Sequence, residues 1–205
     1  MRPHWQSRLR WMERVILVSS LVLLAVPAVT VLEGWLFQRR ADQYLISELQ
    51  RHSGPTAVPS IPLTEGGIIG RIEIPRLRLS VALLEGTTPR TLRLGAGHLR
   101  GTAMPGAVGN SAIAAHRDTF FRALRGIHQD DEIHLQTLNG VSIYRVDSIR
   151  VVSPANLDVL KSSSDSELTL VTCYPFYVLG AASDRFIVHA HRQPAPASNF
   201  TKEQK

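Results

Sequence analysis

Residues 167–173 read ELTLVTC and residues 185–191 read RFIVHAH, and these two stretches decide how the chain folds. In each of them apolar and polar residues alternate, which is the pattern of a β-strand with one buried face. If the two strands pair as antiparallel neighbours, the end of the first lies beside the start of the second. Cys173 ends the first strand and Arg185 begins the second. The pattern therefore predicts that these two side chains lie close together at one rim of a sheet.

Short alternations of the same kind occur along the chain before this pair. The further expected strands are 68–74, 77–83, 111–116, 132–138 and 141–152. Asn139-Gly140, between the last two, is typical of a two-residue type I′ hairpin turn. Helical segments are expected only around 88–93, 119–125 and 155–160. Many strands at short spacing indicate an all-β antiparallel barrel or sandwich.

Charge and cysteine content exclude several classes of protein. The formal net charge is +6 over 205 residues, but residues 1–40 carry six arginines and two glutamates, so the rest of the chain is close to balance. A nucleic-acid-binding role is therefore not expected. The single cysteine excludes an intrachain disulfide and a thiolate zinc site. His189 and His191 would share one strand face, but the sequence offers no third ligand near them, so no metal site is predicted.

One stretch is apolar enough to enter a membrane. Residues 15–32, VILVSSLVLLAVPAVTVL, carry no charge, and four arginines precede them. A helix of this length is about 27 Å long, close to the thickness of a bilayer core. The positive-inside rule predicts a cytoplasmic N-terminus and an extracytoplasmic body, in a single-pass protein of the cell membrane. The alternative is a cleaved signal peptide, whose apolar core is usually shorter and is followed by a small-residue cleavage site.

These features predict five segments. Residues 1–14 form the cytoplasmic N-terminus, 15–32 the anchor, 33–67 a juxtamembrane helix (38–50) followed by a linker, 68–192 the β-domain, and 193–205 a loose tail. The linker is rich in Pro, Gly and Ser/Thr, as in segments that hold two parts of a chain apart.

Cys173 has two readings. Free cysteine is often a small buried core residue, but an idle thiol outside the cytoplasm is exposed to oxidation. A reactive thiol needs a nearby imidazole or positive charge. Among the eight histidines, His116 ends the strand 111–116 and so lies at a rim, as Cys173 does; His98, in the loop GAGHLRG, is the second choice.

Three segments resemble the sortase family. TLVTC (169–173) matches the T-L-x-T-C signature, AIAAHRDTFF (112–121) resembles the histidine segment, and SDRFIVHAH (183–191) resembles the arginine segment. The stretches IGRIEIPRLRLSV, GHLRGTAMPGAVGN and LVTCYPF are most similar to class D sortases. Ala115 departs from the pattern, because the family usually has glycine before its histidine.

The resemblance implies an eight-stranded β-barrel and a cofactor-free cysteine transpeptidase. Its substrates would be secreted proteins with a C-terminal LPxT-like sorting signal, and its acceptor a peptidoglycan or pilin amine. The implied roles are nucleophile for Cys173, general acid/base for His116, and substrate binding and oxyanion stabilisation for Arg185. By analogy Thr172 helps to shape the oxyanion site. The substrate-binding candidates are Thr172, His98, Tyr174 and Phe176, the last two in the apolar loop YPFYVLG (174–180).

Two other functions stay open. Exported L,D-type thiol transpeptidases carry a Ser-x-Gly-Cys context, which LVTC does not match. A non-catalytic, membrane-tethered β-barrel binding module, with Cys173 buried and inert, is the rival from a different class. Some sortases bind calcium, but DDE (130–132) is expected to be a solvated turn rather than a metal site.

Overall fold

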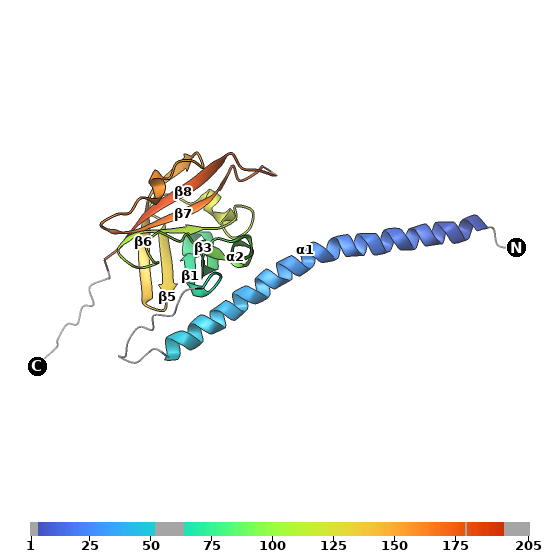
Figure 1. Ribbon diagram of the computed structural model, residues 1–205, viewed down its shortest axis with the longest axis horizontal. Helices are drawn as coiled ribbons and strands as arrows, with labels where there is room; N and C mark the ends of the chain where they lie inside the picture. Colours follow the sequence, from blue (N-terminus) through green and yellow to red (C-terminus); the bar gives the residue numbers. More distant parts are fainter. Residues whose placement is uncertain (1–3, 52–63, 179, 195–205) are drawn as a thin grey trace, which may run out of the picture.

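The computed structural model describes residues 4–51, 64–178 and 180–194. Its body is a closed barrel with the strand order β1-β2-β3-β4-β7-β8-β6-β5, and a single long helix extends from it (Figure 1). The elements, in chain order, are α1 (His4–Arg51), β1 (Ile68–Ile74), η1 (Pro75–Leu77), β2 (Leu79–Glu85), α2 (Pro89–Leu94), β3 (Ala96–His98), β4 (Gly109–Ala114), η2 (Arg122–Gly126), β5 (Glu132–Thr137), β6 (Gly140–Val152), η3 (Asp158–Leu160), β7 (Ser166–Tyr174) and β8 (Asp184–Arg192). The predicted eight-stranded barrel is confirmed, but it is not wholly antiparallel as expected, because β2 pairs with β3 and β4 pairs with β7 in parallel.

Most of the strands lie close to where the alternation places them. The strand expected at 111–116 is β4, Gly109–Ala114, so His116 lies two residues beyond its end rather than at it. Two further differences concern β2 and β3. The second strand begins at Leu79 because Pro75–Leu77 form a short 3-10 turn that ends in a left-handed residue, Arg78, with φ 51°. The three-residue strand β3 was not predicted. It is too short to show an alternation, and its pairing with β2 and β4 makes it a strand.

The predicted type I′ turn between β5 and β6 is wrong. Thr137 pairs with Gly140, so the two turn residues are Leu138 and Asn139, and Gly140 already belongs to β6. A type I′ turn needs positive φ at both central residues, but only Gly140 has it here, at 116°. Gly140 therefore provides the positive φ at the first residue of β6 and is not one of the two turn residues.

The core fills the interior of the barrel with aliphatic side chains from nearly every strand. Its largest fully buried members include Ile72, Leu83, Ile113, Leu135 and Leu170. Close packing also requires a glycine where β1 pairs with β5 and closes the barrel. A Cβ on Gly70 would lie 2.3 Å from the carbonyl oxygen of Gln136, so only glycine lets these strands approach.

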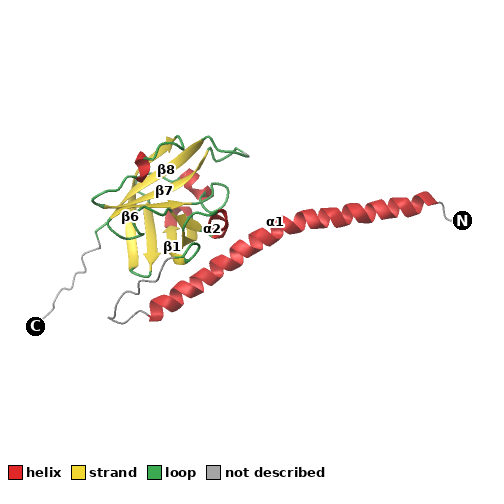
Figure 2. Cartoon of the chain, viewed as in Figure 1, coloured by secondary structure: helices red, strands yellow, loops and turns green. Residues whose placement is uncertain are grey.

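Helical structure is confined to α1 and to short pieces around the barrel (Figure 2). The predicted helix at 88–93 is α2, capped by the Thr88 side chain, whereas the segments expected at 119–125 and 155–160 form the 3-10 turns η2 and η3. The apolar run and the juxtamembrane helix are one continuous helix, α1. It is long and apolar enough to cross a membrane, judged by length and composition. Most of the expected linker and tail, 52–63 and 195–205, lies outside the described residues.

Candidate active site

Cys173 and Arg185 form a directly opposed pair on the antiparallel strands β7 and β8. Leu168 and Leu170 of β7 are fully buried in the core. Because side chains alternate along a strand, Cys173 lies on the opposite, outer face of the barrel, and Arg185 shares that face. The pairing predicted from the two alternating stretches is confirmed.

His116 approaches the same place from the other side of β7. Strand β4 runs parallel to β7, with Ala114 opposite Val171, and the Ala115 amide donates to the Val171 carbonyl at 3.3 Å. Continuing this register by two residues sets His116 beside Cys173. Strands β7 and β8, and the segment that directly follows β4, therefore bring a thiol, a guanidinium and an imidazole to one outer face.

All three of these side chains are half-buried. Cys173 is a free thiol of intermediate exposure. The Arg185 Nη1 donates to the Asp184 carbonyl at 3.0 Å. Within the part of the chain that the structure describes, no carboxylate forms an ion pair with Arg185 or with His116. The positive charge of Arg185 is thus free to meet a negative group above the thiol.

Thr172 ties the histidine segment to the cysteine strand. Its side chain is buried inside the barrel, and its hydroxyl donates to the Ala115 carbonyl at 2.7 Å. After His116 the chain turns back, because the Phe121 amide donates to the His116 carbonyl at 3.0 Å and the Phe121 ring is fully buried in the core. The backbone on both sides of His116 is therefore held in place.

Comparisons with known proteins identify this arrangement. The family model for the sortase domain matches residues 72–193, which span β1 to the end of β8 and include Cys173, His116 and Arg185. The chain belongs to the sortase family.

Two curated sortases and two solved ones illustrate the likeness. The chain is 30% identical over 128 residues to Sortase D of Bacillus subtilis strain 168, covering 62% of this chain and 65% of that one. It is 28% identical over 120 residues to Sortase A of Bacillus anthracis, covering 57% of each. The aligned region thus spans less than two thirds of these two relatives.

Among solved structures, a Clostridium perfringens Sortase D5 transpeptidase superimposes with a TM-score of 0.64 at 26% identity, covering 79% of this chain and 99% of that one. Sortase C of the same organism, solved with the C-terminal cell wall sorting motif, superimposes with a TM-score of 0.60 at 27% identity, covering 80% and 90%. The predicted family and its class D likeness are confirmed.

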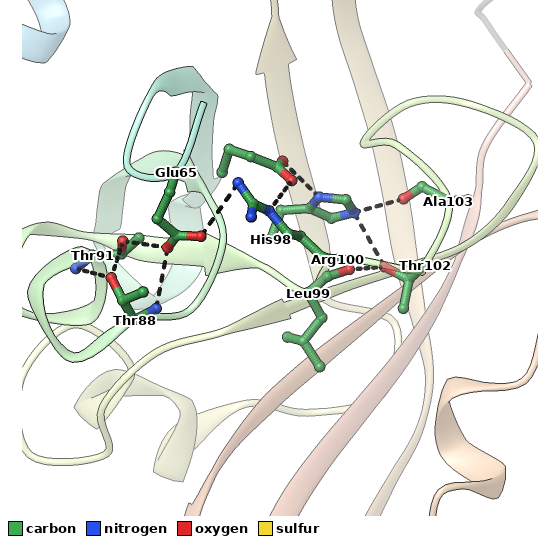
Figure 3. Close-up of polar contacts among 9 residues, drawn as sticks. Glu65, Thr88, Thr91, His98, Leu99, Arg100, Thr102 and Ala103 are labelled. Atoms are coloured by element: carbon green, nitrogen blue, oxygen red, sulfur yellow. Dashed lines mark hydrogen bonds and ion pairs between the residues drawn. The ribbon is translucent and has the colours of Figure 1, made fainter. Parts of the chain in front are cut away.

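The second-choice histidine, His98, lies in a different setting within this sortase. It is 2% exposed at the end of β3, and Figure 3 shows its ring among polar partners. Its Nδ1 is 2.9 Å from a carboxylate oxygen of the buried Glu85, and its Nε2 is 3.0 Å from the Ala103 carbonyl. Arg100 bridges Glu85 to Glu65 at 3.3 and 3.4 Å. Both ring nitrogens are thus engaged inside a buried polar network.

Tyr174 and Phe176 gather with Phe186 at the rim. The ring centroids of Tyr174 and Phe176 lie 6.1 Å apart, and those of Phe176 and Phe186 lie 5.1 Å apart. Phe176 and Phe186 also pack against the core, so this cluster closes the end of the barrel. The next two side chains of the loop, Tyr177 and Val178, are open to solvent, with exposed fractions of 80% and 49%.

Arg117 is a site residue that the sequence analysis did not single out. It follows His116 and is only 8% exposed. Its Nη2 donates to the carbonyls of Val178 and Gly180 at 2.8 and 2.7 Å, and its buried Nη1 has no hydrogen-bond partner among the described residues. Arg117 therefore fastens the β7–β8 loop to the histidine segment. Its position directly after His116 was the one feature of the sequence that could have indicated a role at the site.

The metal-binding alternatives gain no support from the described residues, which contain no group of three or more His, Cys, Asp or Glu side chains placed to hold an ion. His189 bonds to the Thr169 hydroxyl at 3.0 Å, and His191 bonds to Asp147. The expected solvated turn at 130–132 is wrong for Asp131, which is 7% exposed and forms an ion pair with Arg76.

Proposed function

We propose that this chain is a membrane-anchored cysteine transpeptidase. It cleaves an LPxT-type sorting signal near the C-terminus of secreted proteins and transfers each protein to an amine of the cell envelope. The proposal rests on the Cys173–Arg185 pair across β7 and β8, and on the β4–β7 register, whose continuation past Ala114 sets His116 on the same outer face. Two facts support it: the chain belongs to the sortase family, and Cys173, at the end of TLVTC, is a free thiol.

The reaction has two halves. The Cys173 thiolate attacks the carbonyl carbon of the signal's threonine, the C–N bond to the next residue breaks, and His116 gives the departing amine its proton. The thioester keeps the acyl group activated. An acceptor amine, from peptidoglycan or a pilin, then attacks the thioester, His116 takes the amine's proton, and the Cys173 thiolate leaves. Both steps pass through an oxyanion that Arg185, opposite Cys173, can stabilise.

The other candidate residues divide into two groups. Thr172 and Arg117 act as positioning residues, since their hydrogen bonds hold the histidine segment and the β7–β8 loop. The exposed loop side chains Tyr177 and Val178 are better placed to meet a peptide than Tyr174 and Phe176. His98 supports the β2–β3 region rather than the substrate.

The proposal also assigns each segment of the chain a place relative to the membrane. Residues 15–32 of α1 cross the membrane once with the N-terminus in the cytoplasm, and residues 68–192 form the catalytic barrel outside. Residues 1–14, 33–67 and 193–205 form the cytoplasmic N-terminus, the juxtamembrane segment and the tail. Anchoring keeps the thiol near exported substrates and so raises their effective concentration.

Intact-mass spectrometry with a sorting-signal peptide tests the proposal. The full-length chain should gain the mass of the peptide's acyl part on Cys173, and an added amine should release it as the amide. A barrel that is folded but shows no adduct, and whose thiol resists alkylation, would favour the non-catalytic binding module.

A further inference from the structure

The C-terminal part of α1 is docked on the barrel. The Gln38 side chain donates to the Leu94 carbonyl at 2.6 Å and accepts from the Ala82 amide at 2.8 Å. Ala41 and Leu45, on the next turns, are 0% and 3% exposed. Asp42 completes the contact through an ion pair with Arg71. Because these contacts fix α1 against β2 and α2, the direction of α1 decides which side of the barrel faces the membrane.

A cavity of about 540 Å³ lies between α1 and the barrel where the apolar run ends. It is lined by Val31 and Trp35 of α1, Arg90 and Arg93 of α2, and His116 and Phe120 of the segment after β4. Since residues 15–32 are the proposed membrane span, the cavity lies at the level where the helix leaves the hydrocarbon. It is thus positioned at a bilayer surface.

The chemistry of this cavity suits an anionic amphiphile. Its lining combines apolar side chains with two exposed arginines. Glu33 is the one acidic side chain in this lining, so positive charge is in excess. Neither Arg90 nor Arg93 forms an ion pair with any described residue. The Arg39 guanidinium lies 3.8 Å from the centre of the Trp35 ring. Tryptophan and arginine together are typical of the headgroup level of a membrane protein.

The β7–β8 loop supplies a second apolar feature on the same side. It projects from the barrel in the direction in which the N-terminal half of α1 extends (Figure 1). The exposed Tyr177 and Val178 lie on this loop, and the Arg125 guanidinium is 5.8 Å from the centre of the Tyr177 ring. Aromatic and basic side chains in this combination favour the interface of a bilayer.

From these features we infer that the cavity binds the headgroup of an anionic phospholipid of the outer leaflet, with Arg90 and Arg93 contacting the phosphate and the acyl chains lying along α1. The inference rests on the proposed membrane anchoring. It also gives the site an orientation: His116 lines the cavity, so the reactive face is held at the bilayer surface. A substrate whose signal precedes its own apolar span would present the scissile peptide at that level.

Lipid-selective quenching of Trp35 fluorescence tests the inference. The full-length chain, with Trp5→Phe and Trp11→Phe so that Trp35 is the sole tryptophan, is reconstituted into nanodiscs. These contain phosphatidylcholine and phosphatidylglycerol in equal amounts, and either one or the other is brominated. Bulk contact with the bilayer predicts equal quenching. A headgroup site predicts stronger quenching by brominated phosphatidylglycerol.

Three paired variants sharpen the test. Arg90→Gln with Arg93→Gln should weaken phosphatidylglycerol binding by about 25-fold, since each arginine near an anionic surface contributes about fivefold. Arg90→Lys with Arg93→Lys should keep the selectivity. Arg145→Gln with Arg150→Gln, which removes two exposed charges from β6, should also keep it.

The possible failures are distinguishable. Equal quenching by the two brominated lipids in the parent chain overturns the lipid site and leaves the anchoring intact. Selectivity that survives in the Arg90→Gln, Arg93→Gln variant overturns the assignment of the arginines. Release of the chain by alkaline carbonate, with no quenching by either lipid, contradicts the membrane anchoring and the lipid site with it.

Discussion

Cys173 and Arg185 occupy the same rung of the β7–β8 ladder. Residues directly opposite on antiparallel strands have Cβ atoms about 5 Å apart, which lets a long guanidinium side chain reach over the thiol. The pair is therefore set by strand register and does not depend on a loop conformation. A positive charge in this position is suited to the oxyanion that forms when the thiol attacks a peptide carbonyl.

Replacing Arg185 tests this relationship. Arg185→Ala should lower kcat/KM for a sorting-signal peptide by about 10²–10³-fold, as for the loss of an oxyanion donor, and Arg185→Lys should restore part of it. Arg145→Ala, an exposed arginine on β6, is the control and should stay near the parent rate. A parent-like Arg185→Ala enzyme would remove this arginine from the mechanism.

Cys173→Ala should abolish the thioacyl adduct while the barrel keeps its thermal midpoint. The thiol faces outward and is only half-buried, so its loss leaves no sealed cavity in the core. Intact-mass spectrometry and circular dichroism measure the two properties separately. Full turnover by the alanine variant would contradict covalent catalysis by this residue.

His116 and His98 should respond in opposite ways to substitution. His116→Ala should lose orders of magnitude in turnover with little change in stability, since no described residue forms an ion pair with its ring. His98→Ala leaves the buried Glu85 carboxyl without one of its hydrogen-bond partners and should destabilise the fold by about 1–3 kcal/mol. Urea unfolding and peptide cleavage, measured on both variants, separate the effects. Loss of turnover in a stable His98→Ala variant would show that the histidine assignment is wrong.

Arg117→Ala should loosen the β7–β8 loop. Without the two hydrogen bonds to Val178 and Gly180, the peptide bond after the exposed Tyr177 becomes accessible to chymotrypsin. KM should rise more than kcat falls if the loop contacts the signal peptide. Arg122→Ala, a nearby exposed arginine, serves as the control. An unchanged rate of chymotrypsin cleavage would argue against the tether.

The Arg76–Asp131 pair predicts a pH-dependent contribution to stability. The Arg76 guanidinium, and further the His128 amide, lower the pKa of Asp131 from its ordinary value. A carboxyl whose pKa is depressed by folding stabilises the protein above the unfolded pKa, about 3.9, and loses this effect as the pH falls through the folded value.

Asp131→Asn should therefore cost about 2 kcal/mol at neutral pH, and the difference from the parent should shrink as the pH drops below 4. Urea unfolding of the full chain in detergent micelles at several pH values measures it. Asp158→Asn is a suitable control, because its ion pair with Lys161 is fully exposed. A difference that grew at low pH would contradict the sign of the Asp131 shift.

Some of the site was predictable because it depends on local pattern. Alternation in β7 and β8, together with the sequence positions of Cys173 and Arg185, was enough to pair those two residues. His116 needed the family resemblance, since strand ends alone left His98 as an alternative. The polar partners of His98 come from segments on either side of β3, so its burial could not be read from its neighbours in sequence.

The sequence by itself determined the period-2 strands, the apolar run of α1 and the family, because these depend on residues close together in the chain. The tertiary structure alone decided that β3 pairs with β2 and β4 and that β1 closes the barrel against β5. It also decided that Arg117 reaches the β7–β8 loop and that Gln38 docks α1 beside His116. These contacts join segments far apart in sequence. Packing and hydrogen bonding, which select among many possible pairings, form them only when the whole barrel assembles.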